Sequence, residues 1–140
     1  MPRDMDKWLG DGGMRLLAEL DIEMTAYGEG WAEGRWTPSS LCCNPQGFVQ
    51  TGTFTVAIDA AMNFAVLASM EKGETTATLE IKTSNLRAAR QGDELMVRGE
   101  VDRMTRSIAF TSCRVTGGDG ALVAEATGTF ILRRNKAPEG

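Results

Sequence analysis

Asp59 is the residue in this chain whose type and surroundings most clearly suggest chemistry. It lies in the segment 52–70, which is apolar on nearly every side and holds no other charged side chain. An ionised carboxylate that is buried without partners is so costly that it either gains hydrogen bonds or shifts its pKa. A catalytic carboxylate uses both outcomes, although structural networks also bury carboxylates. Asp59 is therefore a candidate general base or nucleophile, and a purely structural carboxylate is the alternative.

The residue types that the chain lacks or contains narrow the remaining chemistry. There is no histidine, which excludes Ser-His-Asp triads, Cys-His pairs and histidine-based metal sites. The net charge of −4 and the pI near 4.9 argue against nucleic acid as a partner. Cys42, Cys43 and Cys113 have no CxxC spacing, so we expect reduced thiols rather than a disulfide framework.

Size and composition predict the type of protein and its compartment. A chain of 140 residues with 42% apolar and 24% charged residues fits one domain, residues 1–140. Residues 1–7 lack the apolar stretch of a signal peptide. The apolar segment is interrupted by Asp59, Asn63 and several threonines, which argues against a membrane span. We therefore expect a cytoplasmic protein that does not enter a membrane.

The first half of the chain supplies the helix that must carry Asp59. Hydrophobic periodicity predicts a short amphipathic helix over 11–20 with Asp11 as a candidate N-cap, strands over 22–27 and 30–36, and a long helix from about Thr51 to Met70. Residues 1–20 thus form an N-terminal helical segment. The long helix ends before Lys72-Gly73, a normal stop signal.

The second half of the chain is nearly all predicted strand. Half-buried strands are predicted over 77–82 and 95–102, and two more over 108–115 and 121–133 flank a glycine-rich hairpin turn. In the first of these strands Ala77, Leu79 and Ile81 are predicted to share one face. Only a sheet can cover so apolar a helix, so the order implies an α+β domain in which a curved antiparallel sheet wraps one long central helix. We expect the tail 135–140 to be frayed.

The residues in front of the long helix form a recognisable motif. The segment 44–52 reads Asn-Pro-Gln-Gly-Phe-Val-Gln-Thr-Gly, and Asp59 falls 15 positions after Asn44. This spacing resembles the hotdog-fold acyl-CoA thioesterases of the phenylacetyl-CoA and 4-hydroxybenzoyl-CoA type. Their motif is Asn-x-x-Gly-x-x-His-Gly-Gly, then six residues, then Asp or Glu. The residues that match in register are Asn44, Gly47, Gly52 and Asp59, and the likeness continues through 79–93 and 124–130.

The resemblance implies a hotdog fold and an acyl-CoA thioesterase that releases CoA and a carboxylic acid without a metal or redox cofactor. It implies that the Thr51 amide donates to the thioester oxyanion, with the helix dipole behind it. Asn44 would hold the attacking water or orient the thioester, and Asp59 would be general base or nucleophile. The catalytic set implied is Asp59, Asn44, Gln50, Thr51 and Gly52. In this family the carboxylate comes from the second subunit, so a homodimer or a dimer of dimers, a homotetramer, is expected.

Substrate contacts are expected from Gly47, Asn63, Thr78, Arg90 and Arg106. Asn63 shares the helix face of Asp59 at position i+4. Thr78 lines up with a hydroxyl residue that assists the water in some relatives, and the two arginines could contact the phosphates of CoA. A solvated strand threonine and solvated arginines are the alternatives that the sequence leaves open.

Two positions depart from the family motif. Gln50 stands where the family usually has His, and its amide can donate and accept but cannot take a proton. Thr51 replaces a Gly, and a β-branched residue does not readily adopt positive φ, so the backbone there must be ordinary. These changes leave open a second interpretation, a non-catalytic acyl-CoA-binding or assembly module with a degenerate hotdog site. The sequence does not define the acyl group.

Overall fold

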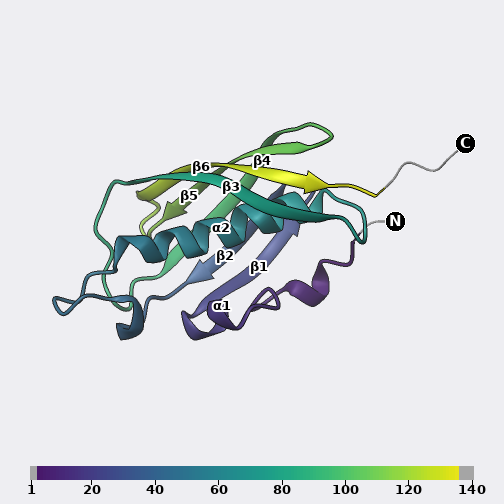
Figure 1. The fold of residues 1–140 in the computed structure, drawn as a ribbon. Helices are drawn as coiled ribbons and strands as arrows, with labels where there is room; N and C mark the ends of the chain where they lie inside the picture. Colours follow the sequence, from purple (N-terminus) through teal and green to yellow (C-terminus); the bar gives the residue numbers. More distant parts are fainter. Residues whose placement is uncertain (1–2, 136–140) are drawn as a thin grey trace, which may run out of the picture.

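The computed structural model describes residues 3–135 and shows a six-stranded antiparallel sheet curved around one long helix (Figure 1). The strand order across the sheet is β1-β2-β4-β5-β6-β3. The elements are η1 (Asp6–Trp8), α1 (Arg15–Glu19), β1 (Ile22–Gly28), β2 (Trp31–Trp36), η2 (Ser40–Cys42), α2 (Thr51–Ala68), β3 (Thr75–Asn85), β4 (Leu95–Met104), β5 (Ile108–Thr116) and β6 (Leu122–Arg133). The α+β architecture expected from the sequence is confirmed.

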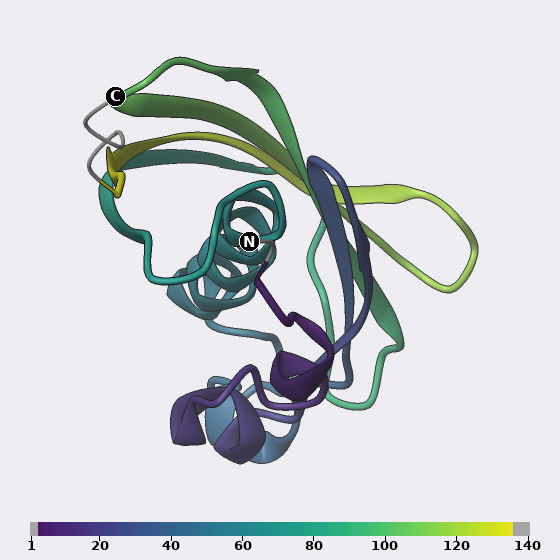
Figure 2. The same cartoon turned by 90° about the vertical axis from the view of Figure 1, so that its right-hand side faces the viewer.

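Helix α2 lies inside the curve of the sheet and contacts all six strands. The end-on view shows the strands bending over it while the N-terminal segment passes along its other side (Figure 2). Phe54, Ile58, Met62 and Val66 are buried on the face toward the sheet. Gly99 allows β4 to pack closely against α2, because a Cβ at this position would lie 2.6 Å from the carbonyl oxygen of Ala61. Within the described residues, α2 is the one helix long and apolar enough to cross a membrane, a property that core helices also have.

The predicted elements are confirmed except at the N-terminal helix, which is shorter than expected. Only Arg15–Glu19 is α-helical, because Gly12 and Gly13 both have positive φ and break the preceding turn. Asp11 is not the N-cap of this helix. Its carboxylate instead accepts a hydrogen bond from the Gly13 amide, at 2.8 Å, and so fixes the turn in front of the helix.

Strand β3 is an edge strand, and the half-buried face predicted for it is wrong. It pairs only with β6, and a register irregularity between Thr78 and Glu80 interrupts the alternation. Ala77 and Leu79, expected to be covered, are exposed, with Leu79 at 55%. Eleven residues therefore present an unpaired backbone edge and two largely uncovered faces in the single chain.

Candidate functional site

The site is centred on Asp59, which lies on the side of α2 that faces the edge strand β3. Its side chain is half-buried, and its Oδ1 accepts a hydrogen bond of 3.0 Å from Oγ1 of Thr78 on β3. Burial raises the pKa of Asp59 above its usual value, and the hydrogen bond from Thr78 opposes that rise. The structure thus brings the two predicted residues together and gives Thr78 a direct contact with the candidate base.

A second contact of the same kind lies one helical turn further along. Asn63 contacts Thr76, whose hydroxyl donates to the Asn63 side-chain oxygen. The four residues from Asp59 to Asn63 rise about 6 Å along α2, and two strand residues span about 6.6 Å, so the antiparallel helix and strand repeat the contact. Thr76 was not predicted from the sequence. The same matching of repeats, applied to Asp59 and Thr78, would have identified it.

The loop before α2 is shaped by Asn44. Its side-chain oxygen accepts hydrogen bonds from the amides of Gln46, at 3.0 Å, and Phe48, at 3.1 Å. Gly47 sits between them with φ of +86°, a conformation that favours glycine. The Asn44 backbone N–H donates to the Phe48 carbonyl at 2.8 Å, whereas within the described part of the chain its side-chain Nδ2 makes no hydrogen bond and remains available as a donor.

The N-terminus of α2 offers exposed backbone N–H groups. The first N–H groups of a helix have no intrahelical acceptor, and here Thr51 and Gly52 are exposed. Gln50 occupies the N-cap position, and its exposed side chain makes no capping hydrogen bond. Thr51 has no positive φ, in line with the expectation of an ordinary backbone. An anion or oxyanion at this end would meet unoccupied donors and the positive end of the helix dipole.

Within one chain the candidate oxyanion donor and the candidate base are far apart. Thr51 and Asp59 are eight positions apart on α2, which corresponds to about 12 Å along the helix axis. A thioester whose carbonyl oxygen accepts from the Thr51 amide is therefore too far from Asp59 of the same chain for that carboxylate to reach the carbonyl carbon or an attacking water. The single chain therefore holds two halves of a site and not a complete one.

The two candidate phosphate-binding arginines lie at opposite ends of the helix. Arg90 lies beside the loop that leads into α2, where its guanidinium stacks on the ring of Phe48 at 4.7 Å. Arg106 lies in the turn between β4 and β5, near Glu74, which belongs to the segment that follows α2. The helix between these ends is about 27 Å long. One chain therefore does not bring Arg90 and Arg106 to the same phosphate group.

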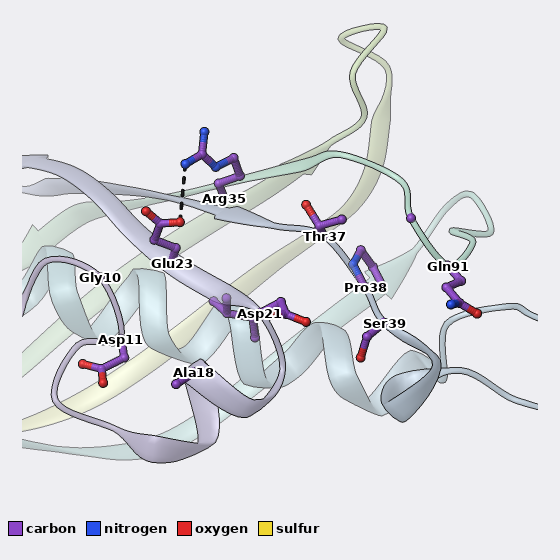
Figure 3. A pocket seen from close by; sticks show the side chains of 12 residues that line it. Gly10, Asp11, Ala18, Asp21, Glu23, Arg35, Thr37, Pro38, Ser39 and Gln91 are labelled. Atoms are coloured by element: carbon purple, nitrogen blue, oxygen red, sulfur yellow. Dashed lines mark hydrogen bonds and ion pairs between the residues drawn. The ribbon is translucent and has the colours of Figure 1, made fainter.

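A cavity of about 650 Å³ lies between the N-terminal segment and the end of β2, and Figure 3 shows the side chains that line it. Asp11, Asp21 and Glu23 contribute carboxylates to it, and Arg35 forms an ion pair with Glu23 at 3.4 Å. None of the site residues predicted from the sequence lines this cavity. Volume alone therefore does not identify the site.

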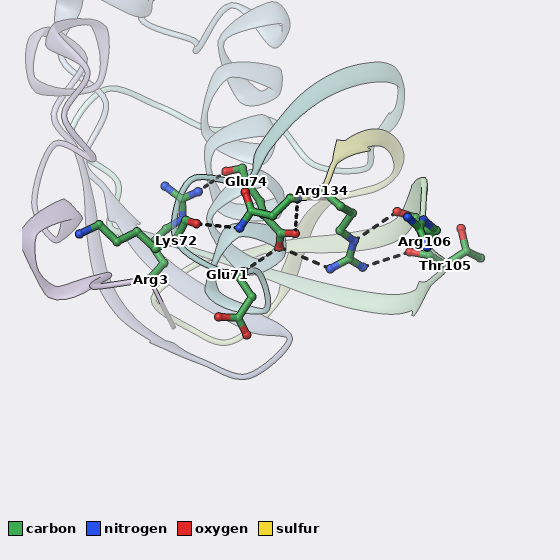
Figure 4. A network of polar contacts seen from close by, with 8 residues as sticks. Arg3, Glu71, Lys72, Glu74, Thr105, Arg106 and Arg134 are labelled. Carbon is green, nitrogen blue, oxygen red and sulfur yellow. Dashed lines mark hydrogen bonds and ion pairs between the residues drawn. The ribbon is translucent and has the colours of Figure 1, made fainter. Parts of the chain in front are cut away.

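The segment that follows α2 is fixed by Glu74, which the sequence did not single out (Figure 4). Its buried carboxylate accepts from the amides of Glu71, at 2.8 Å, and Asn135, at 2.9 Å, and lies 3.7 Å from Arg134. These N–H groups, first that of Glu71, lower the pKa of Glu74. Asn135 is thus held in place, contrary to the expectation that it would be frayed. The rest of the predicted tail, 136–140, lies outside the described residues.

Thiol and metal chemistry find no support in the part of the chain that the structure describes. The three cysteines are unpaired there. Burial raises the pKa of Cys113 to about 12 and also raises that of Cys42, so neither is a ready thiolate. Among residues 3–135, no group of three His, Cys, Asp or Glu side chains is arranged to hold a metal ion.

Comparison with known proteins places this arrangement in a family. Residues 46–124, more than half of the chain, match the model of the thioesterase superfamily. The chain belongs to the thioesterase superfamily. The matched range contains Asp59, Thr78 and every other predicted site residue except Asn44. The thioester hydrolase expected from the sequence is the enzyme class of this family.

Relatives agree with this assignment at the level of sequence and fold. A Pseudomonas aeruginosa protein proposed to be an esterase is 32% identical over 90 residues, which are 64% of this chain and 66% of that protein. A Ralstonia eutropha protein proposed to be a thioesterase, related to phenylacetic acid degradation, is 29% identical with a TM-score of 0.76, covering 83% of this chain and 88% of its own. A Haemophilus influenzae thioesterase has a TM-score of 0.81 at 21% identity, covering 87% and 85%. The expected hotdog fold is confirmed.

Proposed function

We propose that this protein is an acyl-CoA thioesterase that hydrolyses a thioester to free CoA and a carboxylic acid. In this proposal Asp59 is the general base or the nucleophile, and the Thr51 amide stabilises the oxyanion. Asn44 holds the attacking water or orients the thioester through its free side-chain nitrogen. Gln50, at the N-cap, and Gly52, in the first turn of α2, belong to the same proposed catalytic set. The protein acts in the cytoplasm and uses no metal or redox cofactor.

The observation that carries the proposal is the environment of Asp59. It is the one charged residue of α2, and burial raises its pKa while Thr78 holds its orientation. A carboxylate with a raised pKa at the half-covered face of a buried helix is suited to accept a proton from water. The chain contains no histidine that could take this role instead.

The proposal requires a second copy of the chain. The 12 Å between Thr51 and Asp59 within one α2 means that a complete site needs the helix N-terminus of one copy and the carboxylate of another. The unpaired edge and exposed faces of β3 supply a surface for such an association. We therefore propose a homodimer, or a dimer of dimers, with sites shared between subunits.

The choice of CoA as the thiol rests on hotdog-fold structures with bound ligand. A Streptococcus pneumoniae thioesterase holds coenzyme A, and a Streptococcus mutans protein holds acetyl-CoA, each at 20% identity. In this chain we propose Arg90, which stacks beside the helix N-terminus, and Arg106 as contacts for CoA phosphates. Gly47 and Asn63 are proposed to contact the pantetheine or acyl part.

The experiment is turnover of a panel of acyl-CoAs with detection of the released thiol, joined to sedimentation at micromolar protein. We expect hydrolysis and a species of at least two chains. A stable monomer would contradict the shared site. Binding of CoA esters in calorimetry without any hydrolysis would favour the second candidate, a non-catalytic acyl-CoA-binding or assembly module, which the Gln50 position motivates.

A further inference from the structure

A second cavity lies between α2 and the N-terminal segment, and its lining begins one helical turn from the candidate base, at Asn63. It is open to solvent on one side, has a volume of about 370 Å³ and is bounded by three parts of the chain: α2, the start of β3 and the N-terminal segment. Its helix wall is formed by Ala60, Asn63, Phe64 and Leu67. At 100° per residue, these four residues lie about 40° to 140° around α2 from Asp59, so the cavity is centred about a quarter turn from the base and Asn63 is the wall residue nearest to it in direction.

The contacts between α2 and β3 place the cavity beside the site. Asp59 is bonded to Thr78, and Asn63, which lines the cavity, is bonded to Thr76, which also lines it. From Asp59 to Leu67 the helix rises about 12 Å. A group that enters beside Asp59 and follows the helix therefore passes Asn63 and reaches the cavity.

The opposite wall of the cavity is built by the N-terminal segment. Trp8, Met14 and Leu17 contribute large apolar side chains. The Trp8 ring packs so closely on Gly13 that a Cβ at Gly13 would lie 2.3 Å from it. Gly13 also has positive φ, so the backbone and the absent side chain together fix where the indole lies.

The character of the lining indicates what kind of group the cavity would hold. Trp8, Met14, Leu17, Phe64 and Leu67 give it a largely apolar surface. In the described part of the chain, the buried side-chain nitrogens without a partner are Arg3 Nε and Trp8 Nε1, which belong to lining residues but are themselves inaccessible to solvent. An apolar chain cannot accept a hydrogen bond from either nitrogen, so the apolar lining is the observation that suggests the occupant.

We propose that this cavity binds the acyl group of the substrate and that the N-terminal segment limits the size of the acyl group, with Trp8 in the wall opposite α2. The inference rests on the proposed thioesterase function and extends it to a substrate class. At about 30 Å³ for each water-sized group, a volume of about 370 Å³ holds at most about 12 such groups. With incomplete filling, the substrate class is an apolar acyl chain of about eight to ten non-hydrogen atoms.

The test compares acyl-length profiles of variants that resize the cavity from opposite walls. Trp8→Ala enlarges the cavity at the wall opposite α2, and Ala60→Leu fills it from the helix. Met14→Ala widens it at a half-exposed position, where unfolding is not expected. Leu16→Ala is the matched control, since Leu16 and Met14 are 48% and 50% exposed in the same segment but only Met14 lines the cavity.

We expect the wild type to have its highest kcat/KM on octanoyl-CoA or decanoyl-CoA in a straight-chain series from acetyl to hexadecanoyl. Trp8→Ala and Met14→Ala should move the optimum longer by about two carbons, and Ala60→Leu shorter by about two. Each misfitting methylene changes kcat/KM by about tenfold or more. The control should keep the wild-type profile. Variants that change every substrate by one common factor would overturn the inference while the thioesterase function stands.

A separate measurement covers the case in which no acyl-CoA is hydrolysed, which would refute the proposed function. Calorimetry with free octanoic and decanoic acids then tests the cavity directly. Binding by the wild type that Ala60→Leu abolishes and Leu16→Ala preserves would support an acyl cavity in a non-catalytic protein. Absence of binding, or equal binding by all variants, would overturn the inference.

Discussion

Replacement of Asp59 by Asn removes the proposed base while keeping its shape. The Asn side-chain oxygen can still accept the 3.0 Å hydrogen bond from Thr78, so the contact with β3 should survive. Asp59 is the only charged residue of α2, and no histidine exists to replace it, so only binding and the oxyanion donor remain. General-base catalysis contributes about 100-fold to 10,000-fold. We expect turnover to fall by at least about 100-fold, which is about 2.7 kcal/mol of transition-state stabilisation, with little change in ligand affinity.

The same variant makes a stability prediction with a defined sign. Burial raises the folded-state pKa of Asp59 above its unfolded value. The favourable contribution of the carboxyl is therefore complete below the unfolded pKa, near pH 4, and is lost as pH rises through the folded pKa. Above that pH, Asp59→Asn should melt at the same temperature as the wild type or higher, and the difference should disappear in acid.

The assay measures turnover and melting temperature on one preparation of each protein. Asp102→Asn is the matched control, because Asp102 also accepts a hydroxyl hydrogen bond, from Ser112 at 2.9 Å, but at an exposed position of the sheet. The control should keep full turnover. If Asp59→Asn keeps most of its activity per folded molecule, or loses stability at neutral pH in proportion to its activity, Asp59 is structural and the catalytic role is refuted.

Three further predictions follow from the contacts described. Thr78→Val removes the hydrogen bond that opposes the raised pKa of Asp59, so the acid limb of the kcat/KM profile should move to higher pH; an unmoved limb would separate Thr78 from catalysis. Gln50→His should preserve or raise hydrolysis, and a large loss in the thiol-release assay would give Gln50 a role of its own. Glu74→Gln should lower the free energy of unfolding at neutral pH by about 1–3 kcal/mol, because charged hydrogen bonds to the Glu71 and Asn135 amides are weakened. The lowered pKa of Glu74 means that this difference, measured by denaturant unfolding, should shrink as pH falls through the folded pKa.

The sequence predicted the parts of the fold that periodicity encodes. The long apolar helix and the paired strands follow from patterns that burial imposes, and their bounds agree with the structure within a few residues. Strand β3 was misread because its alternation of Ala77, Leu79 and Ile81 is that of a half-buried strand, whereas its neighbours in a single chain do not cover it. The apolar side chains of β3 are thus uncovered in one chain, which is consistent with burial against the second copy that we propose.

The site was predicted only as far as local spacing reaches. The sequence spacing from Asn44 to Asp59 spans only one loop and one helix, so the sequence motif could identify both residues. The contact between Asp59 and Thr78 depends on how β3 passes α2, and the sequence left that threonine undecided between a site and solvent. The cavity wall at Trp8 was beyond reach, because it depends on how the glycine turns of the N-terminal segment place an indole against a helix.

The contacts of Glu74 with Arg3 and Asn135 have a practical consequence for experiments with this protein. Arg3 donates to the Glu74 carbonyl oxygen, and Asn135 donates to its carboxylate, so both ends of the described chain meet directly in front of the unpaired strand β3. A purification tag or fusion partner at either end would leave the fold beside this edge and beside the cavity that Arg3 lines. We expect a tag at either end to interfere with association through β3 and with the substrate preference, so the tag should be removed before either property is measured.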